Sequence, residues 1–267
     1  MNHKLSVAGV QYLHQQGDRE GNLRKAADFI RSSPGRDLYV MPELASSGYG
    51  REAFEQLDDL AEDADGPSFQ AFSALAREMN AYICYSFPRN AGKQKPTICA
   101  AVVDRNGDLV VCYDKWHVCQ YGECAEKIYF DAGDSEPGVF SIDGIKVGVM
   151  ICYDIRFPEL ARKLTVDHGV SLIIHPGGWP RDEGYSTWHT FVVTRAIENT
   201  AYIMSPNRAG DHNGGSIFCA PFTDLMTHFP DKLEKEEGVL TGEVDMARLA
   251  QARETFTVLA DRRSDLY

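Results

Sequence analysis

Ile145-Lys-Val-Gly-Val-Met-Ile-Cys-Tyr-Asp-Ile-Arg-Phe-Pro-Glu-Leu160 joins a strand, a cysteine and the start of a helix. The apolar run before Cys152 is typical of a strand buried on both faces. Asp154 is a residue type that caps helices, and Pro158 suits a first helical turn, which does not need its N–H. The pattern predicts that the Cys152 side chain projects from the end of a rigid strand. Backbone N–H groups and the positive end of a helix dipole would lie close to it and favour a thiolate. A buried structural cysteine is the alternative, and burial statistics alone favour it.

The bulk composition indicates a globular protein with a sizeable core. The chain has 267 residues, of which 43% are hydrophobic and 25% charged. Its net charge of −12 argues against nucleic acid and anionic membrane surfaces as partners. No apolar run approaches the about 18 residues of a membrane-spanning helix, and the start of the chain lacks a signal-peptide pattern. We therefore expect a cytoplasmic protein with neither a nucleic-acid nor a membrane partner.

The seven cysteines argue against a disulfide framework. Their number is odd, their spacing is irregular, and several lie in apolar runs, as expected of reduced thiols. No C-x-x-C pair occurs, which disfavours both a zinc site and a thiol redox protein. We expect no metal and no organic cofactor. The positions are Cys84, Cys99, Cys112, Cys119, Cys124, Cys152 and Cys219.

Alternating patterns predict one α/β domain over residues 1–267. Turn pairs at Asn106-Gly107 and Asp143-Gly144 predict two hairpins. Strands with two apolar faces indicate sheets covered by helices, and neither a repeat nor a linker divides the chain. Strands are predicted at 5–11, 37–41, 81–87, 98–103, 109–113, 139–142, 145–151, 170–175, 201–205, 215–220, 224–229 and 239–244. Helices are predicted at about 18–32, 67–80, 158–168, 186–199 and 245–252.

Three reactive side chains follow apolar strand patterns. Glu43 follows Leu38-Tyr-Val-Met-Pro, Lys115 follows Val110-Val-Cys-Tyr-Asp, and Cys152 follows the run quoted first. The serine-hydrolase, zinc-protease and nucleotide-binding motifs G-x-S-x-G, H-E-x-x-H, G-x-x-x-x-G-K-[ST] and G-x-G-x-x-G are absent. A structural Glu43–Lys115 salt bridge, or solvated strand ends, would explain the first two residues equally well.

Together these blocks resemble the nitrilase superfamily of carbon–nitrogen hydrolases. The similar segments are Met41-Pro-Glu43, Tyr113-Asp-Lys-Trp-His117 and Ile151-Cys-Tyr-Asp-Ile-Arg-Phe-Pro-Glu159, and the similarity spans essentially the whole chain. It implies a four-layer αββα sandwich. It also implies a homodimer formed through the outer helices near 158–168 and 186–199, with a tail at about 253–267 reaching the partner.

The resemblance implies a Glu-Lys-Cys triad. Cys152 would attack a carbonyl carbon, Glu43 would serve as general base and then acid, and Lys115 would stabilise the oxyanion. The backbone N–H of Tyr153 would assist Lys115. A second glutamate, Glu126, would position substrate and hold Lys115, with Glu123 as the competing assignment.

The Tyr153-Asp154 pair after the cysteine is similar to the pair found in the amidase and N-carbamoyl hydrolase branches of this superfamily. This similarity implies the substrate class. We expect hydrolysis of a small linear carboxamide to carboxylate and ammonia, as in an aliphatic amidase or ω-amidase. An N-carbamoyl (ureido) hydrolase and a non-catalytic binding protein are the alternatives. The expected substrate-binding residues are Tyr49, His117, Tyr153 and Trp179. A histidine such as His117 or His175 can equally be a hydrogen-bonded structural residue, and acidic Glu123, Asp182 or Glu183 at the pocket mouth would favour an amine-bearing substrate.

Overall fold

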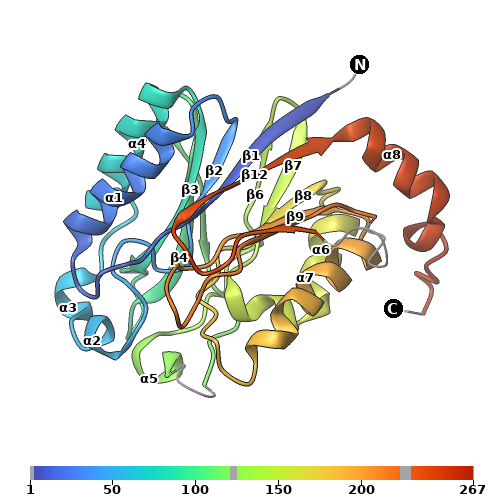
Figure 1. Ribbon diagram of the computed structural model, residues 1–267. Coiled ribbons are helices and arrows are strands. Elements are labelled where there is room, and N and C mark those ends of the chain that lie inside the picture. Colours follow the sequence, from blue (N-terminus) through green and yellow to red (C-terminus); the bar gives the residue numbers. More distant parts are fainter. Residues whose placement is uncertain (1–2, 121–124, 223–229, 267) are drawn as a thin grey trace.

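The computed structural model describes residues 3–120, 125–222 and 230–266, which form two six-stranded sheets (Figure 1). The strand predicted at 224–229 lies outside these ranges. The first sheet, ordered β12-β1-β2-β3-β4-β5, contains β1 Lys4–Gln11, β2 Leu38–Val40, β3 Tyr82–Arg89, β4 Thr97–Val103, β5 Leu109–Asp114 and β12 Gly238–Asp245. The second, ordered β11-β10-β9-β8-β7-β6, contains β6 Val139–Ile142, β7 Ile145–Val149, β8 Leu172–Ile174, β9 Tyr202–Ser205, β10 Ile217–Cys219 and β11 Asp231–Lys232.

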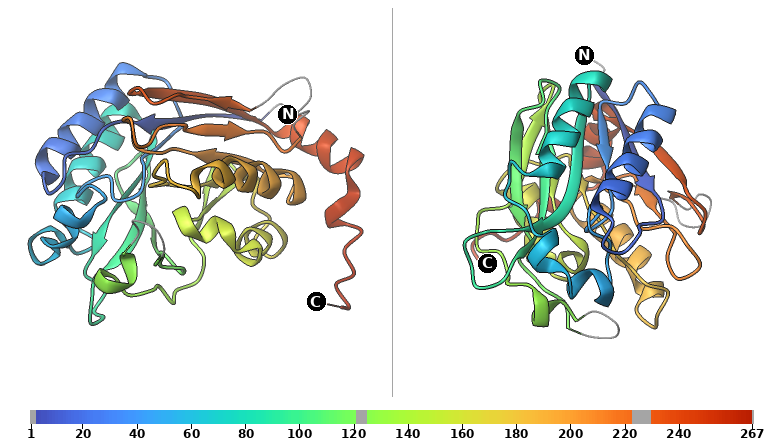
Figure 2. Two further views of the ribbon diagram at one scale, coloured as in Figure 1. Left: turned by 60° about the horizontal axis from the view of Figure 1, so that its bottom comes forward. Right: turned by 90° about the vertical axis from the view of Figure 1, so that its left-hand side faces the viewer.

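The two sheets lie between two helical layers (Figures 1 and 2). Helices α1 (Arg19–Ser32) and α4 (Pro67–Met79) cover the outer face of the first sheet, whereas α6 (Pro158–Val166) and α7 (Tyr185–Glu198) cover the second. Helix α8 (Met246–Thr255) and the chain after it extend away from this body (Figure 2). The predicted αββα sandwich is therefore confirmed.

Alternation along β1 shows how one strand serves two cores. Leu5 and Val7 are buried between the sheets, whereas Ala8 and Val10 belong to the core beneath α1 and α4. Gly9 faces β9, where an added Cβ would lie 2.7 Å from Met204 Sδ. The sheets can therefore approach closely at this point because residue 9 has no side chain.

Strand directions bring several strand ends to the same region. β1, β2 and β3 are parallel, and two antiparallel steps make β5 run in the direction of β3. In the second sheet, β7, β8 and β9 are parallel. The segments after β2, β5 and β7 therefore emerge at carboxyl-terminal sheet edges, where open α/β sheets commonly place their binding sites.

The short helices differ from the sequence-based prediction. Helices α2 (Arg51–Phe54), α3 (Leu57–Leu60) and α5 (Glu126–Tyr129) were not predicted, because four-residue helices have no readable apolar period. The longer predicted helices are present to within a few residues at each end. Within the described ranges, no helix has the length and apolar character needed to cross a membrane.

Candidate active site

Four reactive side chains meet where these segments emerge. Glu43 follows β2, Lys115 directly follows β5, Glu126 begins α5, and Cys152 begins the 3₁₀ helix η1 (Cys152–Arg156) after β7. Glu43, Lys115 and Glu126 are 0% exposed, and Cys152 is 7% exposed. Charged groups are costly to bury unless they are paired, so this arrangement requires mutual compensation.

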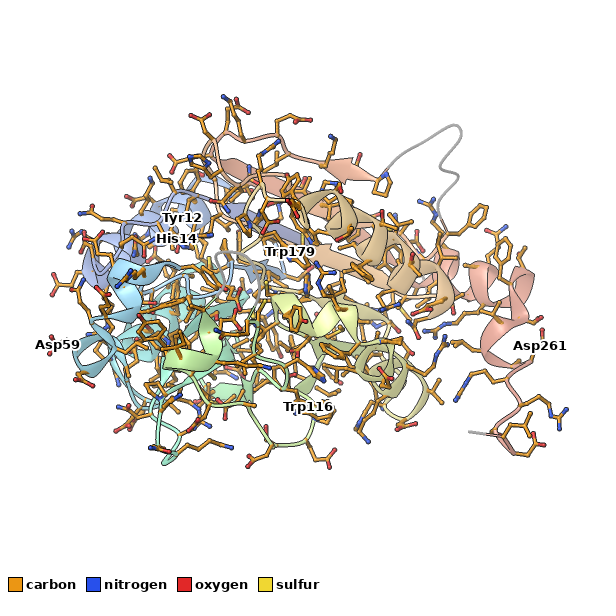
Figure 3. All side chains as sticks on the ribbon, turned by 90° about the horizontal axis from the view of Figure 1, so that it is seen from below. Tyr12, His14, Asp59, Trp116, Trp179 and Asp261 are labelled. Atoms are coloured by element: carbon orange, nitrogen blue, oxygen red, sulfur yellow. The ribbon has the colours of Figure 1, made fainter. Side chains whose placement is uncertain are left out.

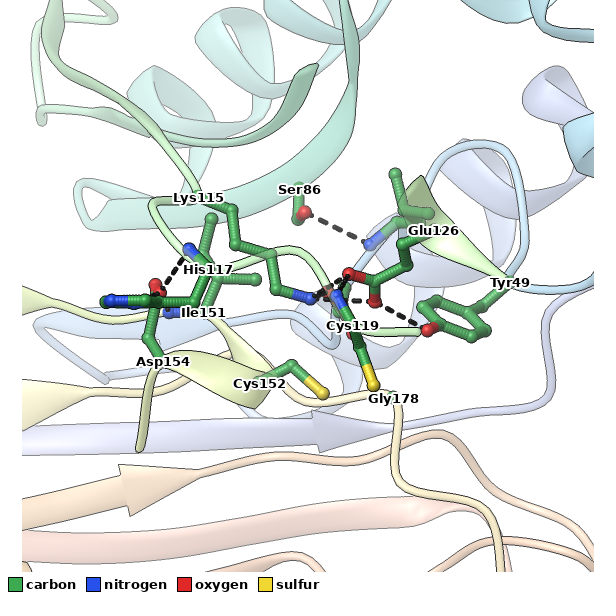
Figure 4. A network of polar contacts seen from close by, with 12 residues as sticks. Tyr49, Ser86, Lys115, His117, Cys119, Glu126, Ile151, Cys152, Asp154 and Gly178 are labelled. Atoms are coloured by element: carbon green, nitrogen blue, oxygen red, sulfur yellow. Dashed lines mark hydrogen bonds and ion pairs between the residues drawn. The ribbon is translucent and has the colours of Figure 1, made fainter. Parts of the chain in front are cut away.

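Lys115 lies between two carboxylates. Its Nζ is 2.7 Å from Glu43 Oε1, and 2.7 and 2.8 Å from Glu126 Oε1 and Oε2 (Figure 4). Burial alone would lower the pKa of Lys115, but the charges of Glu126 and Glu43 outweigh it and raise that pKa well above its usual value. Lys115 is therefore a fixed ammonium in a water-poor site, suited to stabilising an oxyanion.

Glu126 is held on both carboxylate oxygens. Oε1 accepts a hydrogen bond from the Tyr49 hydroxyl at 2.6 Å, and Oε2 accepts one from the Cys119 backbone N–H at 2.7 Å (Figure 4). These bonds fix the carboxylate that faces Lys115. Glu123, the competing second glutamate, lies outside the described residues.

Glu43 connects the lysine to the cysteine. Its Oε1 contacts Lys115, and its carboxylate also accepts a hydrogen bond from Cys152. Burial raises the pKa of Glu43 to about 7, although the charge of Lys115 opposes that rise. A carboxyl group with a pKa near neutrality can both accept and return a proton at physiological pH.

Gly178 leaves room for the second oxygen of Glu43. A Cβ at residue 178 would lie 2.8 Å from Glu43 Oε2 and 3.2 Å from the Tyr49 ring. Because Lys115 and the sheet hold Glu43 in place, the oxygen has no simple way to move aside. No sequence pattern indicates this role, since Gly178 is far from Glu43 along the chain.

The backbone of Cys152 is held in an unusual conformation. Its φ is 44°, its N–H donates to the carbonyl of Pro176 at 2.9 Å, and its own carbonyl accepts from His175 Nε2 at 2.8 Å. His175 Nδ1 faces the Ser205 hydroxyl at 2.7 Å, and burial lowers the pKa of His175 to about 4. His175 is therefore a neutral, hydrogen-bonded residue behind the nucleophile, which settles the alternatives left open by the sequence.

The sequence analysis predicted that Asp154 caps the following helix, and this prediction is wrong for α6. The N-cap position of α6 is Phe157, which offers no side-chain hydrogen bond. Asp154 instead accepts hydrogen bonds from the Tyr113 hydroxyl (2.9 Å) and from the backbone N–H of Ile151 (3.0 Å). Its other oxygen is 3.0 Å from the His117 N–H and 2.8 Å from His117 Nδ1. Asp154 thus ties the strand before Cys152 to the segment after Lys115.

Arg195 of α7 supports the turn that follows the nucleophile. Its Nε donates to the carbonyl of Ile155 at 3.0 Å, and its Nη2 donates to that of Arg156 at 3.2 Å. Glu198 Oε1 lies 2.9 Å from Arg195 Nη1. This pair anchors η1 from the helix layer.

A small pocket of about 290 Å³, including its open mouth, lies over Cys152. Tyr153 and Trp179, two of the expected substrate-binding residues, lie in its wall, whereas Tyr49 lies behind Glu126. His117 is not brought into the wall, because it pairs with Asp154 and stacks on Phe157 at 3.7 Å. Cys119, Gly178 and Pro180 also line the pocket, although they were not among the expected substrate-binding residues. The described lining residues are Cys119, Glu126, Cys152, Tyr153, Gly178, Trp179, Pro180 and Asp182.

Comparison with known proteins agrees with this geometry. The family model described as carbon-nitrogen hydrolase matches residues 6–254. This chain belongs to the carbon–nitrogen hydrolase family. The predicted resemblance to the nitrilase superfamily is thereby confirmed.

Several members of the carbon–nitrogen hydrolase family are similar over nearly the whole chain. The 2-oxoglutaramate amidase of Bacillus subtilis is 31% identical, covering 99% of this chain and 100% of the relative. A CN-hydrolase superfamily protein from Xanthomonas campestris, whose active site carries an arsenic adduct, has a TM-score of 0.85 at 26% identity, covering 98% of each chain. A mutant amidase from Nesterenkonia sp. AN1 has a TM-score of 0.81 at 26% identity, covering 98% of this chain and 95% of the neighbour. Its active-site cysteine carries the acetamide moiety of fluoroacetamide.

Proposed function

We propose that this carbon–nitrogen hydrolase is an amidase, which converts small linear carboxamides to the carboxylate and ammonia. The observation that carries the proposal is the buried contact of Lys115 with Glu43, beside a hydrogen bond from Cys152 to Glu43, below a small pocket. The sequence-based interpretation as an amidase is confirmed by relatives named as amidases, one of which carries an amide-derived group on its cysteine.

The first half of the reaction forms a thioester. The thiol of Cys152 gives its proton to Glu43, and the sulfur attacks the carbonyl carbon of the amide. Lys115 and the backbone N–H of Tyr153 stabilise the resulting oxyanion, and one such donor contributes about 3 kcal/mol. Glu43 returns the proton to the nitrogen, the C–N bond breaks, and ammonia leaves.

The second half regenerates the enzyme. Glu43 takes a proton from water, and the hydroxide attacks the thioester carbon to give a second oxyanion beside Lys115. The C–S bond then breaks, Glu43 returns its proton to the Cys152 sulfur, and the carboxylic acid leaves. The same carboxyl group moves the proton in both halves, which suits its pKa of about 7.

The test is ammonia release from aliphatic amides, ω-amido acids, amino-amides and ureido compounds, with Cys152→Ala as the control. We expect turnover of at least one amide class by the wild-type protein and none above background by the variant, because the thioester cannot form. Mass spectrometry of a rapidly quenched reaction should show the acyl group on Cys152. Carbon dioxide release from a ureido compound would favour an N-carbamoyl hydrolase, and equal rates for both proteins would overturn the hydrolase assignment.

We also propose a homodimer that pairs the outer faces of α6 and α7. Val166 on α6 and Ile197 on α7 are each 40% exposed, so the outer layer over the second sheet presents apolar side chains to solvent. The segment after α8 projects away from the body, with Asp261 near its far end (Figures 2 and 3). Its exposed Val258 and Leu266 support a role for residues 253–267 in reaching the partner subunit.

Sedimentation velocity checks this assembly. We expect the wild-type protein to sediment with twice the mass of one chain, and Val166→Glu with Ile197→Glu to give monomers, since two buried carboxylates would oppose association. An exposed substitution on α1, Arg24→Glu, serves as the control and should leave the dimer intact. A monomeric wild-type protein at micromolar concentration would contradict the proposal.

We further propose that residues 1–267 form one domain located in the cytoplasm. A core shared between the two sheets supports the first statement. The second is supported by the free thiols of Cys84, Cys99 and Cys112, as expected of a reducing compartment. Fractionation of the source cells, followed by immunoblotting, checks the location.

A further inference from the structure

The pocket carries a charge that the catalytic groups do not use. Among the described residues lining it, the charged side chains are Glu126 and Asp182. Glu126 is already engaged by Lys115, Tyr49 and the Cys119 N–H. Asp182 is partly exposed, and one of its oxygens accepts the Gly184 N–H at 2.8 Å. No described cation forms an ion pair with it, so its negative charge remains available at the pocket.

Two nearby arginines contact groups other than this carboxylate. Arg181 Nε donates to the Asn213 carbonyl at 2.6 Å, and its guanidinium lies 4.8 Å from the centre of the Tyr185 ring. Arg208 Nη1 donates to the Tyr49 carbonyl at 2.7 Å. Neither residue belongs to the described pocket wall. Within the described residues, neither of these two arginines forms an ion pair with Asp182.

Arg156 is a third arginine close to the described pocket wall. Its guanidinium lies 5.1 Å from the ring centres of both Trp179 and Phe191, and it also faces the Tyr153 ring. These contacts hold it against aromatic faces, outside the residues that line the pocket. Arg156 is therefore engaged by aromatic rings, whereas Asp182 itself lines the pocket.

We propose that Asp182 is a specificity residue that selects carboxamides bearing an ammonium group at the end away from the amide. The proposal rests on the amidase function above and names its substrate class. An ammonium near Asp182 gains a charge-assisted hydrogen bond, whereas a carboxylate there is repelled. Because Cys152 and Asp182 line the same small pocket, we choose substrates with a short chain between the amide and the ammonium group. This choice contrasts with the 2-oxoglutaramate amidase, whose named substrate is an anion.

Three amides with equal chain lengths test the proposal: the amide of γ-aminobutyric acid, pentanamide and glutaramate. They place an ammonium, a methyl group and a carboxylate at the same distance from the amide. The measured quantity is kcat/KM for ammonia release, expressed relative to pentanamide. We expect the wild-type enzyme to prefer the amino-amide by about tenfold, the size of one charged hydrogen bond, and to discriminate against glutaramate.

Asp182→Asn is the matched variant, because an asparagine oxygen can still accept the Gly184 N–H while the charge is lost. We expect the preference for the amino-amide to fall about tenfold in this variant, mostly through KM. Glu183→Gln removes an exposed neighbouring charge outside the pocket wall and should keep the preference. Raising the ionic strength should weaken the preference in the wild type but not in Asp182→Asn.

The outcomes separate the two proposals. If glutaramate is the best of the three substrates, or if Asp182→Asn keeps the wild-type preference, the role of Asp182 is overturned while the amidase function stands. If none of the three amides, nor any other amide in the wider panel, releases ammonia, the amidase function itself fails. A preference lost equally in Glu183→Gln and Asp182→Asn would indicate a general surface field rather than a contact with Asp182.

Discussion

Glu43→Gln should reduce kcat/KM for amide hydrolysis by about a thousandfold, because in the proposed mechanism the carboxyl group of Glu43 moves the proton in every step. Glutamine has the same shape and can still accept from Lys115 through its amide oxygen, but it cannot take a proton from Cys152 or return one to ammonia. We therefore expect a folded protein with very little residual amidase activity. Steady-state ammonia release measures the loss, and iodoacetamide labelling of Cys152 shows that the nucleophile is still accessible.

The pH dependence provides a second readout for Glu43. The base works only when deprotonated, so a pKa of about 7 predicts that wild-type kcat/KM rises with pH through neutrality. The residual activity of Glu43→Gln should lack this rise. Glu62→Gln is the matched control, since Glu62 is also buried but contacts Ser68 rather than the site, and it should retain the wild-type profile. A Glu43→Gln variant with near-normal turnover would contradict the assignment of Glu43 as the base.

Lys115→Met should impair both stability and catalysis. It leaves Glu43 and Glu126 buried without their cation, a type of change that costs about 3–5 kcal/mol in the free energy of unfolding. It also removes the proposed oxyanion donor, and the loss of one such donor costs about a hundred- to thousandfold in kcat. Urea unfolding and ammonia release measure the two effects separately.

The instability of Lys115→Met should increase as the pH rises. The pKa of Glu43 is already raised by burial, and without the opposing charge of the lysine it rises further above its unfolded value. A group with a raised folded pKa stabilises the fold below its unfolded pKa, about 4.5, and loses that contribution as the pH rises through its folded value. Adding Glu126→Gln to Lys115→Met removes one of the uncompensated charges and should restore part of the stability. Equal stability of wild type and Lys115→Met at pH 8 would contradict this account.

Local pattern was sufficient to place the reactive residues on the fold. Glu43, Lys115 and Cys152 each follow an apolar strand, and strand direction then places all three at sheet edges. The order of their motifs along the chain gave the family. The position of these three residues at the ends of buried strands could therefore be predicted from the sequence, although the distances between their atoms could not.

Contacts between distant loops could not be predicted in this way. Glycine is required at position 178 because the Glu43 carboxylate, from the other half of the chain, lies against it. The Cys119 N–H reaches Glu126 only because of the path that its loop takes. Asp154 matched a helix-capping pattern, but the Tyr113 hydroxyl and His117 engage it across the interface between the sheets. Such long-range partners override a local propensity, because tertiary hydrogen bonds in a buried site are costly to leave unmade.

The left-handed backbone of Cys152 has an evolutionary consequence. A residue other than glycine at this φ costs on the order of 1 kcal/mol, a cost that the proposed role of the thiol explains at position 152. A descendant that loses its activity has no reason to keep that cost, and glycine or asparagine would relax the turn between β7 and η1. Among homologues that have lost the activity, position 152 should therefore be substituted by glycine or asparagine before the surrounding core residues change.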